Sequence, residues 1–532
     1  MTRARPSVRR PLTALALALA VGGGLLAWNR PRLPEAPDIF LITVDTLRAD
    51  RLGAYGYAGA RTPTIDGLAR EGTTFLQATT PFPRTTPGLA SLLTGLWPLH
   101  HGSREVAQPM GDVTTLAEIL RSRGYVTLGA SANGAAGPHQ GMDRGFETFL
   151  DYRDLAPPIA EVVTDETLQI LRGAPRDRPV FLWVHYIDPH FPYLPPAHWK
   201  DQPQAPGCRR MMSELAGDRW KIGEIQIDRD GLATSVLAEC SELYDAEIAY
   251  NDAEIGRLLE GLETLRDRPS LELFTADHGE NLGEAGLFYE HGPSIHDASL
   301  RVPLILHGDG IPRRVDTRPV RLEDVVPTLL ELLGIPRDAR PEMDGRSFAH
   351  RLRPWRAEVP WSPGAPDTYA ESGSSLLPNT FRWPFSGRAH DLHCLNSPEL
   401  SLCGAPGEEP RLHRPAEDPR LEVDLREELP EEYEILHDAR RRWVPEQVRE
   451  RALRTDRFKL VEYPQWRGGY RSALYDLGTD PGEIRDVKHL FPEEFQDLSR
   501  RLGRWTAHLP TSSGDERSEE QLEALRALGY VQ

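Results

Sequence analysis

Hydrophobic residues in this chain follow two alternating patterns. The first is a short, continuous apolar run bounded by turn-forming residues, which is typical of a strand buried on both faces of a sheet. The second places apolar residues at helical spacing, as in residues 114–124 and 244–265. Their alternation predicts an α/β fold, a doubly wound and mostly parallel sheet with helices on both faces. The predicted strands are DIFLITVD (38–45), PVFLWVHY (179–186), LELFTAD (271–277) and VPLILHG (302–308).

Two stretches interrupt this alternation. Residues 196–235 are polar and irregular, so we expect them to cross over one edge of the sheet. The stretch from 351 to 450 is rich in Pro, Arg and Glu, which predicts surface loops with some helix. We therefore expect an N-terminal segment (1–36), a main domain (37–350), an irregular insertion (351–450) and a smaller C-terminal α+β subdomain (451–532) that ends in a short amphipathic helix.

The N-terminus has the pattern of an export signal. Four arginines within the first ten residues precede the apolar run LTALALALAVGGGLLAW (12–28). That run is close to the lower length limit of a membrane span, so a single uncleaved anchor is the alternative. We expect an exported protein that is periplasmic, extracellular or held at a membrane by this segment.

The four cysteines suit an oxidising compartment. Cys208 and Cys240 flank one irregular segment, and Cys394 and Cys403 lie close together in another. Two local disulfides are the simplest of the three pairings, and four reduced thiols are the alternative.

Charge limits the partners. The net charge of −18 argues against nucleic-acid binding, because a phosphate backbone would be repelled. An anionic substrate then requires a metal or a local cationic pocket.

Polar residues that follow the predicted strands are the candidates for chemistry, because working groups in such sheets lie beyond the carboxyl ends of the strands. Asp45 ends one run, and Asp277 and His278 end another. A lone Asp here is commonly a helix cap or turn former, but two carboxylates with an imidazole fit one divalent metal ion. Zinc or manganese suits such a set better than calcium, which prefers oxygen ligands alone. The run 179–186 leads to a third group, His185, Asp188 and His190.

The segment RTTPGLASLLTG (84–95) begins a predicted helix. Thr85 or Thr86 can cap it, and Pro87 suits its first turn. An ordinary cap explains these residues, but a helix N-terminus also favours an anion. If Asp45, Asp277 and His278 hold a metal, the Thr85 hydroxyl can complete the site and attack phosphorus or sulfur.

The ordered set of motifs resembles the sulfatase family of the alkaline-phosphatase superfamily. The resemblance covers nearly all of the chain after residue 36. It rests on ITVDTLRADRLGAYGY, TPTIDGLAREGTTFLQAT, TTPGLASLLTG, VHYIDPHFPYLPP, TADHGENLGEAG, LRVPLILHG, DVVPTLLELLGI, MDGRSF, LRTDRFKLVEY and ALYDLGTDPGE, in that order.

The resemblance implies roles for individual residues. It makes Asp45, Thr85, Asp277 and His278 the metal ligands and places Thr85 at the nucleophile position. His190 and His291 match residues that contact the anionic oxygens and the leaving group, so they are the expected general acid and oxyanion stabiliser.

Several positions depart from the family pattern. Sulfatases carry Cys or Ser at position 85, which is oxidised to formylglycine; a threonine cannot give that aldehyde, so no formylglycine is expected. The family arginine four residues later is Leu89, the second Asp of the usual pair is Thr46, and the lysine–histidine stretch is replaced by GASANGAAG (129–137). This chain looks similar to phosphodiesterases and phosphoethanolamine transferases of the superfamily, which use a metal-bound threonine, so the unmodified Thr85 hydroxyl is the expected nucleophile.

The leading hypothesis is an exported, metal-dependent hydrolase of sulfuric or phosphoric esters with Thr85 as nucleophile. Its substrate would be a small anionic ester, or a glycan or lipid that carries one. The alternatives are a transferase that passes a phospho-group to a glycan or lipid, and a catalytically silent binding protein. Metal content separates the silent protein from the two enzymes.

Overall fold

A computed structural model of the chain provides the fold. It describes residues 36–152, 159–217, 234–284, 288–292, 295–352, 368–374, 393–396, 401–404, 409, 411–414, 423–441, 449–464 and 470–506. The expected export segment and the expected C-terminal helix lie outside these residues. Among the residues described, no helix is both long and apolar enough to cross a membrane.

An eight-stranded sheet forms the centre of the molecule, and its middle strands are parallel. Strand β1 lies between β6 and β7 and is parallel to both, and β4 continues the parallel set beyond β6. Every residue of β1 is buried, because helices cover the sheet on both sides. In spatial order the strands are β12 (Arg314–Asp316), β2 (Thr73–Phe75), β11 (Leu304–Gly308), β7 (Ser270–Ala276), β1 (Asp38–Val44), β6 (Val180–Tyr186), β4 (Val126–Ser131) and β5 (Thr148–Asp151).

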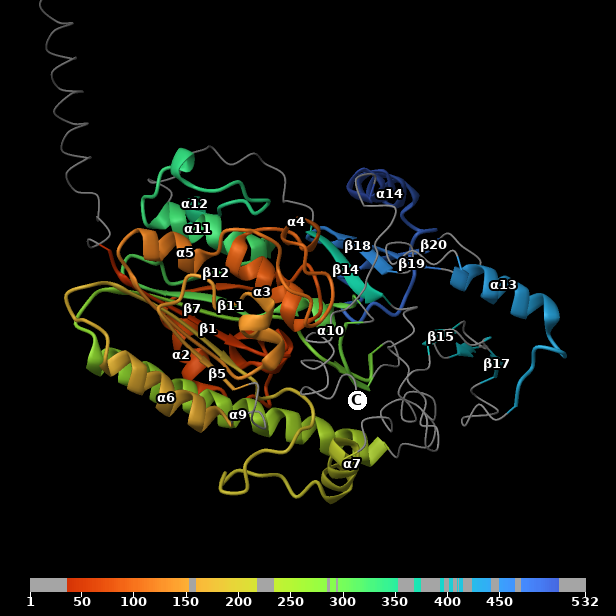
Figure 1. Ribbon diagram of the computed structural model, residues 1–532, viewed down its shortest axis with the longest axis horizontal. Coiled ribbons are helices and arrows are strands. Elements are labelled where there is room, and N and C mark those ends of the chain that lie inside the picture. The colour runs from red at the N-terminus through yellow and green to blue at the C-terminus, as the bar shows by residue number, and fades with distance from the viewer. Residues whose placement is uncertain are drawn as a thin grey trace, which may run out of the picture.

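Two groups of helices cover the two faces (Figure 1). One face carries α2 (Pro63–Glu71), α6 (Ala160–Arg172) and α9 (Thr234–Leu265), and the other carries α3 (Thr85–Thr94), α5 (Leu116–Ser122), α11 (Val325–Leu332) and α12 (Ala349–Leu352). The α/β fold and its mostly parallel sheet are therefore confirmed. The predicted strand at 302–308 is present as β11, which runs antiparallel to β7.

A second sheet lies beside the first and belongs to the C-terminal region (Figure 1). Its strands, in spatial order, are β14 (Thr368–Ser374), β18 (Arg449–Arg454), β19 (Phe458–Pro464) and β20 (Tyr470–Asp476), and α14 (Pro492–Thr506) packs against it. Since β14 lies in the stretch expected to hold loops and helix, part of that stretch completes this sheet. The four-part division itself stays a prediction.

Shorter elements complete the described fold. The helices are α4 (Pro98–His101), α7 (Pro206–Gly217), α10 (Asp297–Leu300) and α13 (Pro430–Arg441). The strands are β3 (Ala78–Thr79), β8 (Asn281–Leu282), β9 (Phe288–Glu290), β10 (Arg301–Val302), β13 (Val320–Arg321), β15 (His393–Asn396), β16 (Ser401–Gly404) and β17 (Arg411–His413).

One of the two expected disulfides is present. Cys208 of α7 is bonded to Cys240 of α9, and their Cα atoms are 5.2 Å apart. Cys394 and Cys403 face each other in the register of β15 and β16. A bond between that second pair stays a prediction.

Candidate active site

The carboxyl ends of four parallel strands bring distant residues together at one edge of the sheet. Asp45 directly follows β1, Asp277 directly follows β7, His185 is the next-to-last residue of β6, and Asn133 lies two positions beyond β4. All four side chains are buried. The site is thus a product of strand order, as expected for a doubly wound sheet.

Three of the buried groups have the geometry of a metal-binding cluster. Asp45, His185 and Asp277 each offer a ligand atom within 4.8 Å of the others. In addition, Nε2 of His278 lies 3.4 Å from Oδ2 of Asp277 and 3.8 Å from Oδ1 of Asp45. The structure therefore brings together the predicted ligands Asp45, Asp277 and His278 and adds His185, which the sequence placed at a strand end without a role.

The unsatisfied atoms of this cluster fit a cation. Oδ1 of Asp45, Oδ2 of Asp277 and Nε2 of His185 are buried and have no hydrogen-bond partner. Burying a carboxylate without a partner is costly, and a divalent metal would satisfy all three atoms at once. Two carboxylates with imidazole nitrogens form a ligand set suited to zinc or manganese.

The two carboxylates have opposite pKa shifts. Burial alone raises the pKa of Asp45, but the His185 ring, whose Nε2 lies 3.4 Å from Oδ2 of Asp45, and the positive charge of His190 hold it below its usual range. The pKa of Asp277 is raised well above its ordinary value, first by burial and then by the negative charge of Asp45. A metal would replace the proton that this repulsion leaves on the pair.

The His278 ring is held by its own loop. Its Nδ1–H donates to the carbonyl oxygen of Gly279 at 2.9 Å. Nε2 therefore carries the lone pair, and it faces Asp277 and Thr85. Burial lowers the pKa of His278, so the ring is neutral and able to bind a metal.

Thr85 is the first residue of α3, whose ten residues are all buried. The cap position is Arg84, whose side chain makes no capping bond, so the expected cap at Thr85 or Thr86 is wrong by one or two residues. The Thr85 hydroxyl instead lies 3.4 Å from Nε2 of His278 and 3.5 Å from Nδ2 of Asn133. Gly88 allows this approach, because a β-carbon there would lie 2.8 Å from the carbonyl oxygen of Asp277.

Thr86, the neighbouring threonine, is occupied elsewhere. Its hydroxyl donates to the carbonyl oxygen of Ala135 at 2.7 Å and accepts from the backbone N–H of Ala107 at 2.8 Å. These bonds join α3 to two loops. Thr86 therefore has a structural role, and Thr85 is the threonine whose hydroxyl lies in the cluster.

His190 and His291 both lie beside the cluster. The ring of His291 is centred 4.4 Å from that of His278 and 5.2 Å from that of His190. Its Nδ1 lies 3.3 Å from Oε1 of Glu280, whose pKa burial raises to about 7. Nδ1–H of His190 donates to the carbonyl oxygen of Phe191 at 2.7 Å. Their roles as acid and oxyanion stabiliser stay a prediction.

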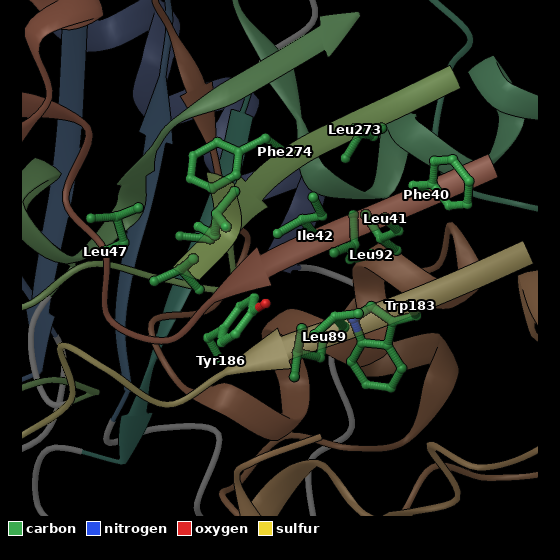
Figure 2. Packing of buried hydrophobic residues seen from close by; sticks show 14 of the residues in the cluster. Phe40, Leu41, Ile42, Leu47, Leu89, Leu92, Trp183, Tyr186, Leu273 and Phe274 are labelled. Atoms are coloured by element: carbon green, nitrogen blue, oxygen red, sulfur yellow. The ribbon is translucent and has the colours of Figure 1, made fainter. Parts of the chain in front are cut away.

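Two departures from the family pattern have structural explanations. Leu89 is fully buried and belongs to the hydrophobic cluster that also contains Leu92, Ile42 and Trp183 (Figure 2). Thr46 has a φ of 54°, and its backbone N–H donates to Oδ1 of Asp277 at 3.2 Å. Position 89 is thus part of the core, while Thr46 helps to orient a predicted ligand.

Asn133 is a site residue that the sequence interpretation missed. Its Nδ2 donates to Oδ2 of Asp45, while its Oδ1 accepts from the N–H of Ala135 at 2.8 Å, which fixes the amide orientation. It lies in the segment 129–137, interpreted as a lost motif. Its position just beyond a strand was the signal that could have identified it.

The fold and this buried cluster define an alkaline-phosphatase-like α/β protein with its site at the carboxyl edge of the sheet. The chain belongs to the sulfatase family, whose model matches residues 37–335. It is 27% identical over 339 residues to an ulvan-active sulfatase of Formosa agariphila, covering 57% of this chain and 62% of that protein. It is also 26% identical over 373 residues to a choline-sulfatase of Rhizobium meliloti, covering 59% of this chain and 70% of that protein.

Solved structures share the fold. A phosphonate monoester hydrolase of Agrobacterium radiobacter superposes with a TM-score of 0.61 at 20% identity, covering 88% of this chain and 95% of that one. Membership of the family supports a hydrolase that acts on sulfate or phosphate esters.

Proposed function

We propose that this chain is an exported, metal-dependent hydrolase of anionic sulfuric or phosphoric esters in which the hydroxyl of Thr85 is the nucleophile. One observation carries the proposal: the Thr85 hydroxyl is buried within 3.5 Å of both His278 and Asn133, beside carboxylate oxygens that lack a partner. The basic and apolar N-terminal pattern supports the export part of the proposal.

Each residue of the cluster has a separate proposed role. Asp45, Asp277 and His278 would hold the metal, with His185 as a further ligand or as the support of Asp45. The metal, when bound, supplies positive charge that keeps the Thr85 oxygen deprotonated, its proton having passed to solvent. Asn133 orients Asp45 through its amide and stabilises the Thr85 oxygen with the same Nδ2.

The reaction would proceed in two displacements. Oγ1 of Thr85 attacks the sulfur or phosphorus, and the bond to the leaving oxygen breaks as the new bond forms. His190 or His291 protonates the leaving oxygen. Water then attacks the same centre and gives a proton to that histidine, and the bond to Oγ1 of Thr85 breaks, which releases sulfate or the phosphorus acid and restores the Thr85 oxygen.

The test uses the full chain and its Thr85→Ala variant, each loaded separately with zinc, manganese or calcium. The substrates are p-nitrophenyl sulfate, the corresponding phosphate, phosphodiester and phosphonate esters, and choline sulfate and ulvan, after the relatives named above. Turnover that the substitution abolishes supports the proposal. Turnover that survives in Thr85→Ala contradicts the assigned nucleophile, and the absence of both turnover and metal favours a silent binding protein.

A further inference from the structure

A buried arginine next to the nucleophile has no hydrogen-bond partner. Arg84 immediately precedes Thr85, and its side chain is only 7% exposed. Its Nε is fully buried without a partner, and among the described residues no hydrogen bond joins its guanidinium to any group. Burying a guanidinium unsatisfied is costly, which is why buried arginines are nearly always paired.

The nearest carboxylate does not neutralise this charge. Oε2 of Glu105 lies 4.0 Å from Nε of Arg84, which is beyond hydrogen-bond distance. The other oxygen of Glu105 accepts from Arg449 at 2.8 Å. Two buried arginines thus share one carboxylate, and Arg84 is the more weakly paired of the two.

The guanidinium lies against the segment that carries His291. A β-carbon built on Gly292 would lie 2.4 Å from Nε and 2.5 Å from Cζ of Arg84, so the planar group packs on the bare backbone of Gly292. The positive charge of Arg84 acts on the His278 ring. Arg84 is therefore within electrostatic reach of the cluster.

We infer that Arg84 is the substrate-binding residue that holds the non-bridging oxygens of the ester's sulfo- or phospho-group. This inference rests on the proposed function and assigns the binding of the anion to one side chain. A guanidinium presents parallel N–H donors whose spacing matches two oxygens of a tetrahedral anion. Bound there, the anion would satisfy Arg84 and present its central atom to the adjacent Thr85.

The test measures anion binding without turnover. Inorganic sulfate and inorganic phosphate are titrated by calorimetry into the metal-loaded full chain and into its Arg84→Gln and Arg84→Lys variants. We expect the dissociation constant of the preferred anion to rise at least about tenfold in Arg84→Gln. The rise should be smaller in Arg84→Lys, which keeps the positive charge but loses the parallel N–H donors. Melting temperature and metal content show that each variant is folded and loaded.

A second variant moves the guanidinium without removing it. Gly292→Ala places a methyl group against Arg84 and should also weaken anion binding. Because Gly292 has a φ of +99°, the matched control is Gly56→Ala, at a φ of +97° with no atom within 4 Å of the new β-carbon. The control should bind the anion as the parent chain does.

The outcomes separate this inference from the proposed function. Arg84-dependent anion binding without ester hydrolysis supports the inference and contradicts the hydrolase. Thr85-dependent hydrolysis, with anion affinity unchanged within twofold in Arg84→Gln, overturns the inference and leaves the hydrolase standing. No anion binding by the metal-loaded parent chain also overturns the inference.

Discussion

Nε2 of His278 lies 3.4 Å from Oγ1 of Thr85, although the two residues are 193 positions apart in the chain. The contact joins the loop after the central strand β7 to the first residue of α3. It places the candidate nucleophile beside a predicted metal ligand.

Thr85 and Thr86 should separate chemistry from stability. We expect Thr85→Val to lower kcat by at least about a thousandfold, as the loss of a nucleophile does elsewhere, while unfolding free energy changes by less than about 1 kcal/mol. Thr86→Val should lower stability by about 1–3 kcal/mol, because a buried carbonyl and an N–H lose their partner. Denaturant unfolding and assays on the two variants test this, and similar losses of stability in both would contradict it.

Metal should stabilise the folded chain through its buried carboxylates. With free metal a hundredfold above its dissociation constant, the gain is about 3 kcal/mol, and a chelator should remove it. In Asp277→Asn the chelator should have little effect, because one carboxylate of the cluster is gone. Melting temperatures with and without chelator, together with the metal content per chain, test this prediction. An equal shift of the melting temperature in the parent chain and in Asp277→Asn would contradict the proposed metal site.

Acid should lower the stability of the folded chain through His101, which contacts α3. Burial lowers the pKa of His101 to about 3, from an ordinary value of 6.5, and its Nε2 lies 3.0 Å from the hydroxyl of Ser91 in α3. The unfolded chain therefore binds a proton that the folded chain does not, and stability falls as pH drops below 6.5. Between pH 7 and pH 5 the loss is about 2 kcal/mol.

The variant His101→Gln measures this contribution. It should be less stable than the parent chain at pH 7, but the difference should shrink by about the same 2 kcal/mol at pH 5. Unfolding by urea at several pH values gives both curves. If the difference in unfolding free energy between the two proteins is the same at every pH, His101 does not gain a proton on unfolding.

A buried lysine should anchor the C-terminal sheet to helix α10. Nζ of Lys459 lies 3.0 Å from Oδ1 of Asp297 and 2.9 Å from Oε1 of Glu483, and it is fully buried. Lys459→Met would remove the ammonium that the two carboxylates share, leaving Asp297 with Arg454 at 3.3 Å and Glu483 with His296 at 3.1 Å, and should cost about 3–5 kcal/mol. The double variant Lys459→Met with Glu483→Gln should recover part of this, because one of the two carboxylates that lost the ammonium is then neutral.

An exposed lysine provides the control for that measurement. Lys488 pairs with Asp486 at 3.0 Å, and its side chain is 41% exposed. Lys488→Met should cost no more than about 1 kcal/mol, as exposed ion pairs do. Equal losses of unfolding free energy in the two single variants would show that the buried ion pairs of Lys459 stabilise the chain no more than the exposed pair of Lys488.

The strand pattern predicted much of the fold and part of the site. Asp45, Asp277 and His278 could be found because each follows an apolar run, and parallel strands bring such ends to one edge. Thr85 could be singled out because a helix N-terminus suits an anion.

The remaining site residues depend on packing that no local pattern encodes. Arg84 looks like an ordinary residue before a helix, and only its burial against Gly292 reveals a guanidinium whose Nε has no hydrogen-bond partner. The antiparallel direction of β11 was equally hidden, since a buried apolar run reads the same in either orientation.

The central place of β1 has a consequence for how the chain is made. It is the earliest strand of the sheet to leave the ribosome, yet both of its neighbours come far later, since Thr43 pairs with His185 on one side and Thr275 on the other. Until then the sequence DIFLITV is an unpaired apolar segment of the kind that aggregates. Shielding residues 38–44 during synthesis should therefore raise the yield of folded protein, and heterologous yield should depend on chaperones that hold nascent apolar segments.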